Sequence, residues 1–176
     1  MGKIKIEKGT IQFLRAHNIL LPVRSLFKLM ESLKERIGEG ETEEILREVG
    51  RFQIKQALVR YTKVLGIEKI EKETFKELGR EILKILGYGE YEIIVNYKEK
   101  MMYFKSDNAP IPTEYKEMYG LSEEPIDYYL CGMLEEVGHA FFGIPMKCVE
   151  TKCIACGDPY CQFEVFPVEE KKETKT

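Results

Sequence analysis

The chain has 176 residues, of which 44% are hydrophobic and 32% are charged, and its formal net charge is −3, values typical of one soluble globular domain with a packed core. The slightly acidic balance and the lack of a basic stretch exclude the electrostatic signature of a nucleic-acid-binding protein. No apolar run approaches the roughly 20 residues of a membrane-spanning helix, so we expect neither nucleic acid binding nor membrane insertion.

Apolar residues recur every three or four positions in the first half of the chain, which predicts helices. The first helix covers about residues 22–37, the second lies within residues 41–66, and the third lies within residues 71–89. The first and third each end at glycines, which favour the left-handed backbone found just beyond helix ends. The segment around His17 shows no such pattern.

The second predicted helix has Thr42 near its start, where a hydroxyl can cap the free backbone N–H groups. Its apolar residues follow an approximately helical period. They are Ile45, Val49, Phe52, Ala57, Val59 and Val64.

After residue 90 the pattern changes to short runs of β-branched and aromatic residues. Residues 91–97 and 100–105 are two such runs, separated by polar residues, and they predict a β-hairpin. Residues 106–125 contain three of the seven prolines and predict a loop with at most a short helix.

Residues 126–143 return to helical spacing and follow two capping signals, Ser122 and Pro125. Two further strand-like runs, residues 145–153 and 160–168, flank the turn sequence ACGDP. They predict a second hairpin at the end of the chain.

Together these elements predict an α+β fold. A helical N-terminal half, residues 1–88, packs on a small antiparallel sheet that residues 89–168 form as hairpin, helix and hairpin. We expect a single domain over residues 1–168. The final residues 169–176, EEKKETKT, carry charge and no apolar side chain, so we expect a disordered tail.

Four of the five cysteines lie in CVETKCIACGDPYC, residues 148–161, on and around the second hairpin. Thiolates are soft zinc ligands, and a structural zinc site takes four ligands in a tetrahedron, commonly with two from a hairpin. The candidates of suitable chemistry on this hairpin are Glu150, Cys153, Cys156 and Cys161.

A fourth ligand has to come from outside the hairpin if three come from it. The preceding helix offers Asp127 and Cys131, which lie one turn apart on one face. Other interpretations stay open: a disulfide between Cys153 and Cys161, or an iron–sulfur cluster with Cys153, Cys156 and Cys161. Free cysteines also pack as small apolar residues in cores.

The segment HAFFGIPMKCVETKCIACGDPYCQFEV, residues 139–165, resembles the closing motif of the 4-vinyl reductase domain family. Members include sensor domains of phenol-responsive transcription activators, a protein linked to bacteriochlorophyll synthesis, and relatives of vesicle-tethering subunits. The resemblance implies a small-molecule-binding α/β domain, often a homodimer.

In the phenol sensors a zinc ion is held by a glutamate and two cysteines of this motif and by a cysteine of the preceding helix. The resemblance therefore implies zinc ligation by Glu150, Cys153 and Cys161. This sequence departs at the helix position, where Asp127 replaces the cysteine. Asp127 or Cys131 is then the candidate for the fourth ligand, and Cys156 is a bystander.

The resemblance further implies a pocket for a small hydrophobic or aromatic ligand between the helices and the sheet, with a structural zinc beside it and a sensory or carrier role. Aromatic and apolar residues of the first hairpin and the last helix are candidates to line that pocket. They are Tyr97, Tyr103, Phe104, Tyr128 and Val137.

Two alternative functions stay open. One is a reductase, or a subunit of one, acting on a vinyl-bearing tetrapyrrole, although the sequence lacks a dinucleotide-binding or haem-attachment motif that would supply electrons. The other is a lipid-holding interaction subunit. We expect a cytoplasmic location, because no signal peptide is evident, and abundant Lys and Glu with few Asn and Gln suggest a thermophilic source.

Overall fold

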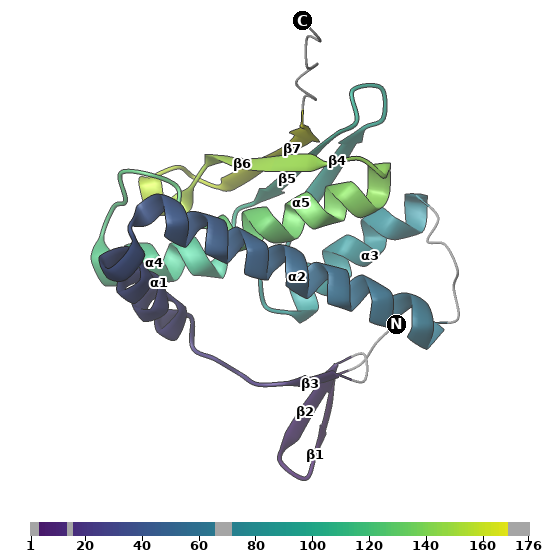
Figure 1. The fold of residues 1–176 in the computed structure, drawn as a ribbon, viewed down its shortest axis with the longest axis horizontal. Coiled ribbons are helices and arrows are strands. Elements are labelled where there is room, and N and C mark those ends of the chain that lie inside the picture. The colour runs from purple at the N-terminus through teal and green to yellow at the C-terminus, as the bar shows by residue number, and fades with distance from the viewer. Residues whose placement is uncertain (1–3, 14–15, 66–71, 169–176) are drawn as a thin grey trace, which may run out of the picture.

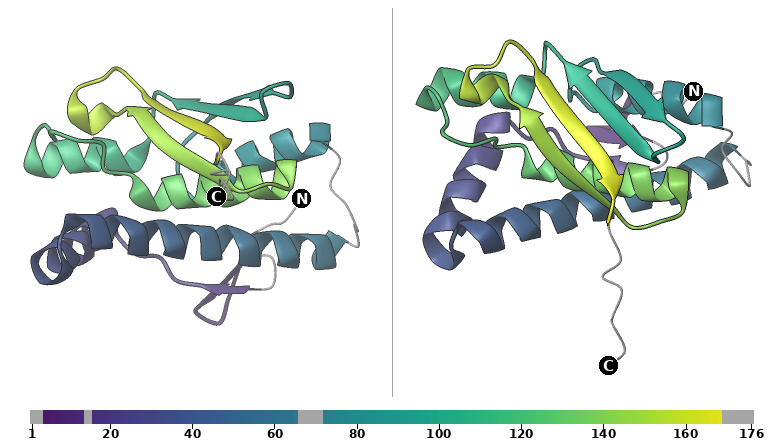
Figure 2. Two further views of the ribbon diagram at one scale, coloured as in Figure 1. Left: turned by 45° about the horizontal axis from the view of Figure 1, so that its top comes forward. Right: turned by 90° about the horizontal axis from the view of Figure 1, so that it is seen from above.

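A computed structural model describes residues 4–13, 16–65 and 72–168, which form three layers (Figures 1 and 2). An antiparallel sheet lies on one side, helices packed on it form the middle layer, and further helices form the third layer. The predicted α+β fold class is confirmed. The tail predicted to be disordered, residues 169–176, lies outside the described residues.

The main sheet has the strand order β4-β5-β7-β6, and every neighbouring pair is antiparallel. Both predicted hairpins contribute to it, and their inner strands β5 and β7 pair at the centre. The strands are β4 (Glu92–Asn96), β5 (Met101–Ser106), β6 (Met146–Lys152) and β7 (Cys161–Pro167).

Helices α3, α4 and α5 form the middle layer, and α1 and α2 lie beyond them (Figure 2). The short helix α4 occupies the segment predicted to be a loop with at most a short helix. The bounds are α1 (Val23–Ile37), α2 (Glu39–Leu65), α3 (Lys72–Ile85), α4 (Pro110–Tyr119) and α5 (Tyr128–Phe142).

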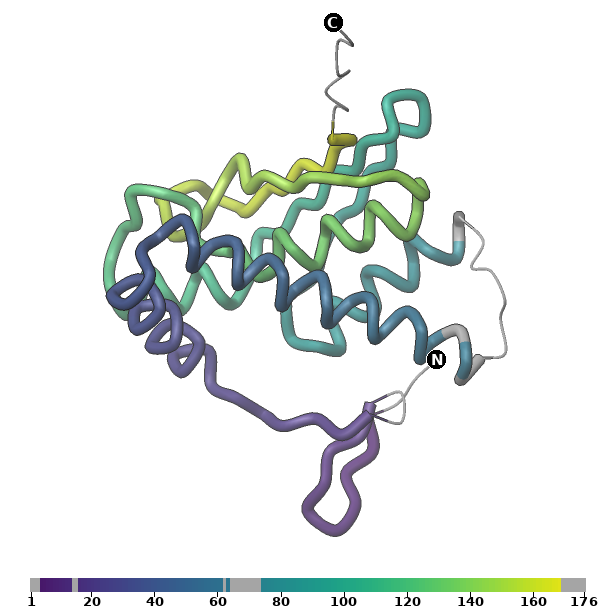
Figure 3. Tube along the Cα trace, in the orientation of Figure 1, coloured from purple at the N-terminus to yellow at the C-terminus, as the bar shows by residue number. Residues whose placement is uncertain are grey.

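A small three-stranded antiparallel meander near the N-terminus was not predicted. Its strands are β1 (Lys5–Glu7), β2 (Thr10–Phe13) and β3 (Ala16–Asn18). Nearly all of its residues are at least partly exposed, so it lacks the apolar alternation that marks a strand in sequence. From β3 the chain runs as an extended segment past α2 to α1 (Figure 3).

Side chains alternate between the two faces of the sheet, as strand geometry requires. Cys148 and Glu150 on β6 therefore face the helices, as do Cys161 and Phe163 on β7. A register irregularity follows Glu150, and β6 ends two residues later. The polar residue Glu150 is thereby buried at the end of the sheet where the hairpin turns.

The backbones of α2 and α5 touch through two glycines. A Cβ atom at Gly132 of α5 would lie 2.0 Å from the Arg47 carbonyl oxygen, and one at Gly50 of α2 would lie 2.1 Å from that of Tyr129. Real Cβ atoms do not approach backbone so closely, so both positions require glycine. The helices therefore pack at a distance that larger residues would prevent.

A buried ion-pair cluster joins the same helices to the sheet. The guanidinium of Arg47 donates to Glu135 Oε1 at 2.9 Å and to the carbonyl oxygen of Cys148 at 3.0 Å. Arg51 donates to Glu135 Oε2 at 2.6 Å. Because Glu135 is buried, these bonds offset the cost of removing its charge from water.

The helix predicted over residues 41–66 is confirmed as α2, but its periodic residues are not all buried and its expected cap was wrong. Val49, Phe52 and Val59 are 48%, 63% and 45% exposed, because α5 packs against the face that carries Gly50. Thr42 is not the N-cap, since α2 begins at Glu39 and the Thr42 hydroxyl donates to the Gly38 carbonyl at 2.7 Å. Close packing thus overrode the sequence periodicity.

The expected cap of α5 was also misplaced. Asp127, and not Ser122 or Pro125, caps this helix by accepting a hydrogen bond from the Leu130 N–H at 3.2 Å. Ser122 instead donates to the carbonyl of Glu124. In the parts of the chain that the structure describes, no helix has the length and apolar character needed to cross a bilayer.

We expect Gly132→Ala to lower the free energy of unfolding by about 3 kcal/mol, because the added methyl group overpacks the contact between α2 and α5. Urea denaturation measures this change. Gly40→Ala is the matched control, since open space surrounds Gly40 in α2; its effect should stay within about 0.5 kcal/mol. Equal stability of the two variants would contradict the proposed role of the glycine contact.

Candidate metal centre and apolar cavity

Glu150, Cys153 and Cys161 converge at the turn between β6 and β7. One ligand atom from each, a carboxylate oxygen and two sulfurs, lies within 4.8 Å of the others. Glu150 lies near the end of β6, Cys153 precedes the short 3₁₀ helix η1 (Ile154–Cys156), and Cys161 begins β7. The hairpin alone therefore assembles three donors.

Local hydrogen bonds hold the turn in this shape. The backbone N–H of Cys153 donates to Asp158 Oδ2 at 2.9 Å, and the N–H of Ile154 donates to the Cys161 sulfur at 3.3 Å. Gly157 has a φ of +99°, which glycine adopts without strain. Gly157 and Asp158 therefore close the turn, which explains why the motif has glycine and aspartate at these positions.

The three donors are buried, with Cys153 and Cys161 at 0% exposure and Glu150 at 6%. Glu150 Oε2 accepts a hydrogen bond from the Asp127 N–H at 3.2 Å. Its Oε1 is buried with no hydrogen-bond partner among the described residues. A buried carboxylate oxygen without a partner is costly, and a bound cation would satisfy it.

Without a metal, protons on the donors reduce the negative charge that Glu150, Cys153 and Cys161 would bring together. Burial, together with the nearby Asp127 and Cys153, raises the pKa of Glu150 to about 10. A hydrogen bond from the Cys161 thiol lowers the pKa of Cys153 to about 6, against the effect of burial. The same bond and burial raise the pKa of Cys161. Glu150 and Cys161 therefore hold their protons at neutral pH, whereas Cys153 is largely a thiolate.

This donor set fits a zinc ion. Two cysteine sulfurs and one carboxylate are ligands that zinc takes in proteins, and backbone N–H groups around the sulfurs suit thiolates. The zinc would neutralise most of the charge that the three deprotonated donors bring together. Its presence stays a prediction.

Asp127 and Cys131 lie near this group but do not join its three converging atoms. The Asp127 carboxylate caps α5, and burial raises its pKa to about 7. Cys131 instead interacts with the Cys148 thiol, and this contact adds to the burial that raises the pKa of Cys148. Either residue would need to change its side-chain conformation or partners to become a fourth ligand.

All five cysteines are free thiols in this structure, so it gives no support to the disulfide between Cys153 and Cys161. Cys156 is only partly buried and lies outside the group of three donors. Burial, together with the neighbouring Cys153, raises the pKa of Cys156 to about 11.

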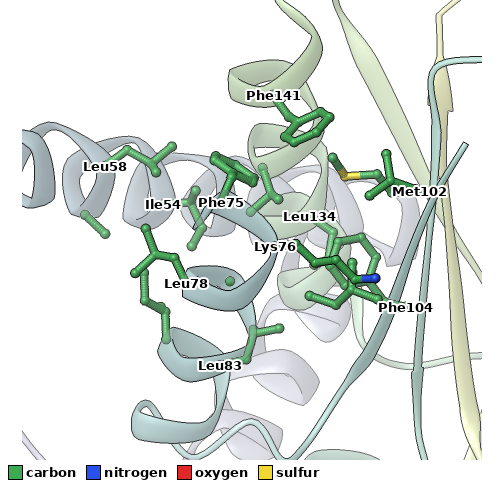
Figure 4. A pocket seen from close by; sticks show the side chains of 16 residues that line it. Ile54, Leu58, Phe75, Lys76, Leu78, Leu83, Met102, Phe104, Leu134 and Phe141 are labelled. Carbon is green, nitrogen blue, oxygen red and sulfur yellow. The ribbon is translucent and has the colours of Figure 1, made fainter. Parts of the chain in front are cut away.

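A separate apolar cavity lies between the helices and the sheet (Figure 4). Its volume is about 40 Å³, counted as space open to the centre of a water-sized sphere, which corresponds to about three water molecules. Five elements line it: α2, α3, β4, β5 and α5. The lining includes Ile54, Leu58, Phe75, Leu78, Met102, Phe104, Leu134, Val137 and Phe141.

The surface that faces this cavity is apolar over its described lining. Lys76 of α3 is the charged lining residue, and it contributes its hydrocarbon stem. Gly79, on the same helix, leaves space that a side chain would fill: a Cβ atom there would meet Ile93 Cδ1 at 3.6 Å, an ordinary contact. The cavity therefore suits a hydrocarbon group.

The five predicted ligand-binding residues are dispersed. Phe104 and Val137 line the cavity, and Tyr97 packs beside the lining residue Phe141, with ring centroids 6.0 Å apart. Tyr103 alternates with Phe104 along β5 and faces away from the helices. Tyr128 lines a different crevice near α2, whose walls include Glu43 and Arg47.

Most of the lining from α2 and α3 was not predicted. Phe75, Leu78 and Ile82 follow the helical period that identified α3, so a signal for one apolar face was available. The spacing of apolar residues does not show whether the apolar face of a helix is fully packed or borders a cavity.

Comparison with known proteins relates this hairpin and the helices before it to a family. Residues 114–167 match the model of the 4-vinyl reductase domain. The resemblance to the 4-vinyl reductase family is confirmed. The matched segment includes the whole of α5, together with Asp127, Glu150, Cys153 and Cys161. No curated protein sequence matches the chain.

Solved structures share the fold beyond the matched segment. The phenol-responsive sensory domain of the transcription activator PoxR, with phenol, superposes with a TM-score of 0.77 at 18% identity, over 98% of this chain and 87% of that one. A vinyl-4-reductase family protein from Methanocaldococcus jannaschii gives a TM-score of 0.52 at 22% identity, over 88% and 85% of the two chains.

A third structure is a trafficking protein particle complex subunit 3 from Naegleria fowleri, covalently bound to palmitic acid. Its TM-score is 0.60 at 16% identity, over 86% of this chain and 93% of that one. At these identities the three structures show that this chain shares their fold, while its ligand has to be argued from its own residues.

We expect zinc affinity to rise about 100-fold per pH unit between pH 7 and pH 8, because binding displaces about two protons. These are the protons of Glu150 and Cys161, whose pKa values are raised, whereas Cys153 is already largely ionised. Competition with a chromophoric chelator of known pH dependence measures the slope. An affinity independent of pH would contradict the protonation states described above.

Proposed function

We propose that this protein is a small-molecule-binding domain with a sensory or carrier role. Its ligand occupies the cavity between α2, α3, α5 and the sheet, and a zinc ion held by Glu150, Cys153 and Cys161 braces the β6-β7 hairpin. The observation that carries the proposal is the apolar cavity in a fold shared with the PoxR phenol-responsive domain.

The lining favours a neutral, apolar ligand. A hydroxyl group buried in this cavity would find no hydrogen-bond partner on the described lining, and an unpaired buried hydroxyl costs about 1–3 kcal/mol. We therefore expect toluene to bind more tightly than phenol. The cavity is small, so a ring-sized ligand would displace lining side chains such as Phe75 and Phe141 outward.

The proposed zinc has a structural role. Three of its ligands come from one hairpin, and Glu150 also accepts the N–H of Asp127 at the start of α5. A metal there would fix the hairpin against the helix that lines the cavity with Leu134, Val137 and Phe141. Asp127 and Cys131 are the candidates within the chain for a fourth ligand.

The lipid-holding alternative has less support. The Naegleria subunit binds palmitic acid covalently, whereas none of the five cysteines of this chain lines the apolar cavity. A long acyl chain would also need far more space than about 40 Å³. An acyl chain inside this cavity would therefore find no cysteine thiol to which it could be attached covalently.

The reductase alternative rests on a relative's family name alone. We find no observation that favours it. Homodimer formation and a cytoplasmic location stay predictions, and analytical ultracentrifugation of the purified chain measures the first.

We expect Cys153→Ser and Cys161→Ser to reduce zinc content and to lower the melting temperature of the zinc-loaded protein, because each variant removes a ligand whose binding energy is coupled to folding. Plasma mass spectrometry and calorimetry measure the two effects. Cys156→Ser is the control, since it lies on the same hairpin outside the donor group. Three variants with the same metal content and melting temperature would exclude this zinc site.

We expect Gly79→Ala to raise the melting temperature, because alanine is favoured over glycine in a helix by up to about 1 kcal/mol. It should weaken toluene binding about tenfold, equivalent to about 1.4 kcal/mol, because its methyl group fills cavity space. Isothermal calorimetry measures the affinity. Gly40→Ala makes the same change far from the cavity and should leave toluene binding unchanged. Equal affinities in both variants would place the ligand elsewhere.

A further inference from the structure

Three consecutive apolar side chains lie in solvent between β3 and α1, where the chain is an extended segment (Figures 1 and 3). Ile19, Leu20 and Leu21 are 84%, 85% and 60% exposed. The backbone groups of these residues make no hydrogen bond within the described part of the chain. Single exposed apolar residues are ordinary, but a continuous run of them marks an interaction surface.

The segment is anchored on its own chain at both ends. Before it, Phe13 of β2 packs with Tyr61 of α2. After it, Phe27 and Met30 of α1 belong to the main hydrophobic core. Between these anchors, residues 19–21 pass α2 without burying their side chains on it. Their exposure is therefore a property of the fold and does not arise from a loose chain end.

A groove beside the segment exposes further apolar side chains. It lies between β3 and α2, has a volume of about 280 Å³, and is lined by residues 16–18 of β3 and by Val49 and Phe52 of α2. Val49 and Phe52 are 48% and 63% exposed. Because β3 leads directly into residues 19–21, the groove and the segment adjoin. We call residues 19–21, Val49 and Phe52 the N-terminal patch.

The groove also offers polar groups to an incoming extended backbone. Gln56 and Arg60 of α2 contribute to its lining, and their side chains make no hydrogen bond or ion pair with the described residues. An amide and a guanidinium donate to backbone carbonyl groups, which an extended segment presents unpaired. Residues 16–21 carry no formal charge at neutral pH, so a second copy of this segment meets the patch without like-charge repulsion.

We propose that the chain forms a two-fold homodimer in which residues 19–21 of each subunit pack on Val49 and Phe52 of the other. Each chain offers one exposed segment and one groove, so a single two-fold axis covers both pairs at once. The family resemblance implies a homodimer but names no surface for it. Neither the apolar cavity nor the metal donors take part in this interface.

The area of the N-terminal patch is sufficient for a stable dimer. Five apolar side chains, each about half exposed or more, lose roughly 500 Å² of apolar surface per chain when they are covered. The two chains together then bury about 1,000 Å², which is the lower limit for a specific interface. Residues 16–18 and the polar groups of the groove add to this area.

Charged substitutions in the full chain test the interface, and analytical ultracentrifugation measures the dissociation constant of the dimer. We expect Leu20→Lys and Phe52→Glu each to raise that constant about 100-fold, because each places an unpaired charge in a covered apolar contact. Both side chains are exposed in the subunit, so the variants keep their fold. Ile94→Glu is the matched control: Ile94 is 54% exposed on the outer face of β4, and its substitution should leave the dimer unchanged.

Mixing the two variants tests the reciprocal contact. A mixed dimer of Leu20→Lys and Phe52→Glu contains one native contact and one contact between opposite charges. We therefore expect mixing to restore dimers at concentrations where each variant alone is monomeric. Absence of this recovery would overturn the reciprocal contact. A monomeric wild type would overturn the proposal, as would a dimer that Ile94→Glu weakens and both patch variants leave intact.

Discussion

The contact between α2 and α5 at Gly50 and Gly132 determines where the rest of the molecule lies. Because the two backbones touch, the guanidinium of Arg47 reaches Glu135 and the Cys148 carbonyl behind it. The buried ion pairs of Glu135 form at this separation. Beyond the contact, α2 continues to Ile54 and Leu58, which line the cavity, so one helix crossing positions both candidate sites.

Helix α5 connects those sites. Its first residues follow Asp127 and bear Cys131, next to the metal donors, whereas its second half bears Leu134, Val137 and Phe141 in the cavity wall. The donors and the cavity therefore share a rigid element whose start is hydrogen-bonded to Glu150. A change in the position of that start would therefore be transmitted along α5 to the wall of the apolar cavity.

The sequence predicted the elements better than their packing. Both hairpins, the helices α1, α3 and α5, and the grouping of Glu150 with two cysteines follow from local patterns and from the family resemblance. The exposed side of α2 could not be predicted, because Gly50 carries no hydrophobic signal although it marks the tightest contact.

The chain separation of the contacts has a consequence for folding. Arg47 and Glu135 are 88 residues apart in sequence, so pairing α2 with α5 requires the closure of a long loop, which is entropically costly and slow. The donors Glu150 and Cys161, in contrast, belong to one hairpin, which forms within microseconds. The hairpin can therefore form before the contact between α2 and α5, so that the last third of the chain is organised before the first third packs against it.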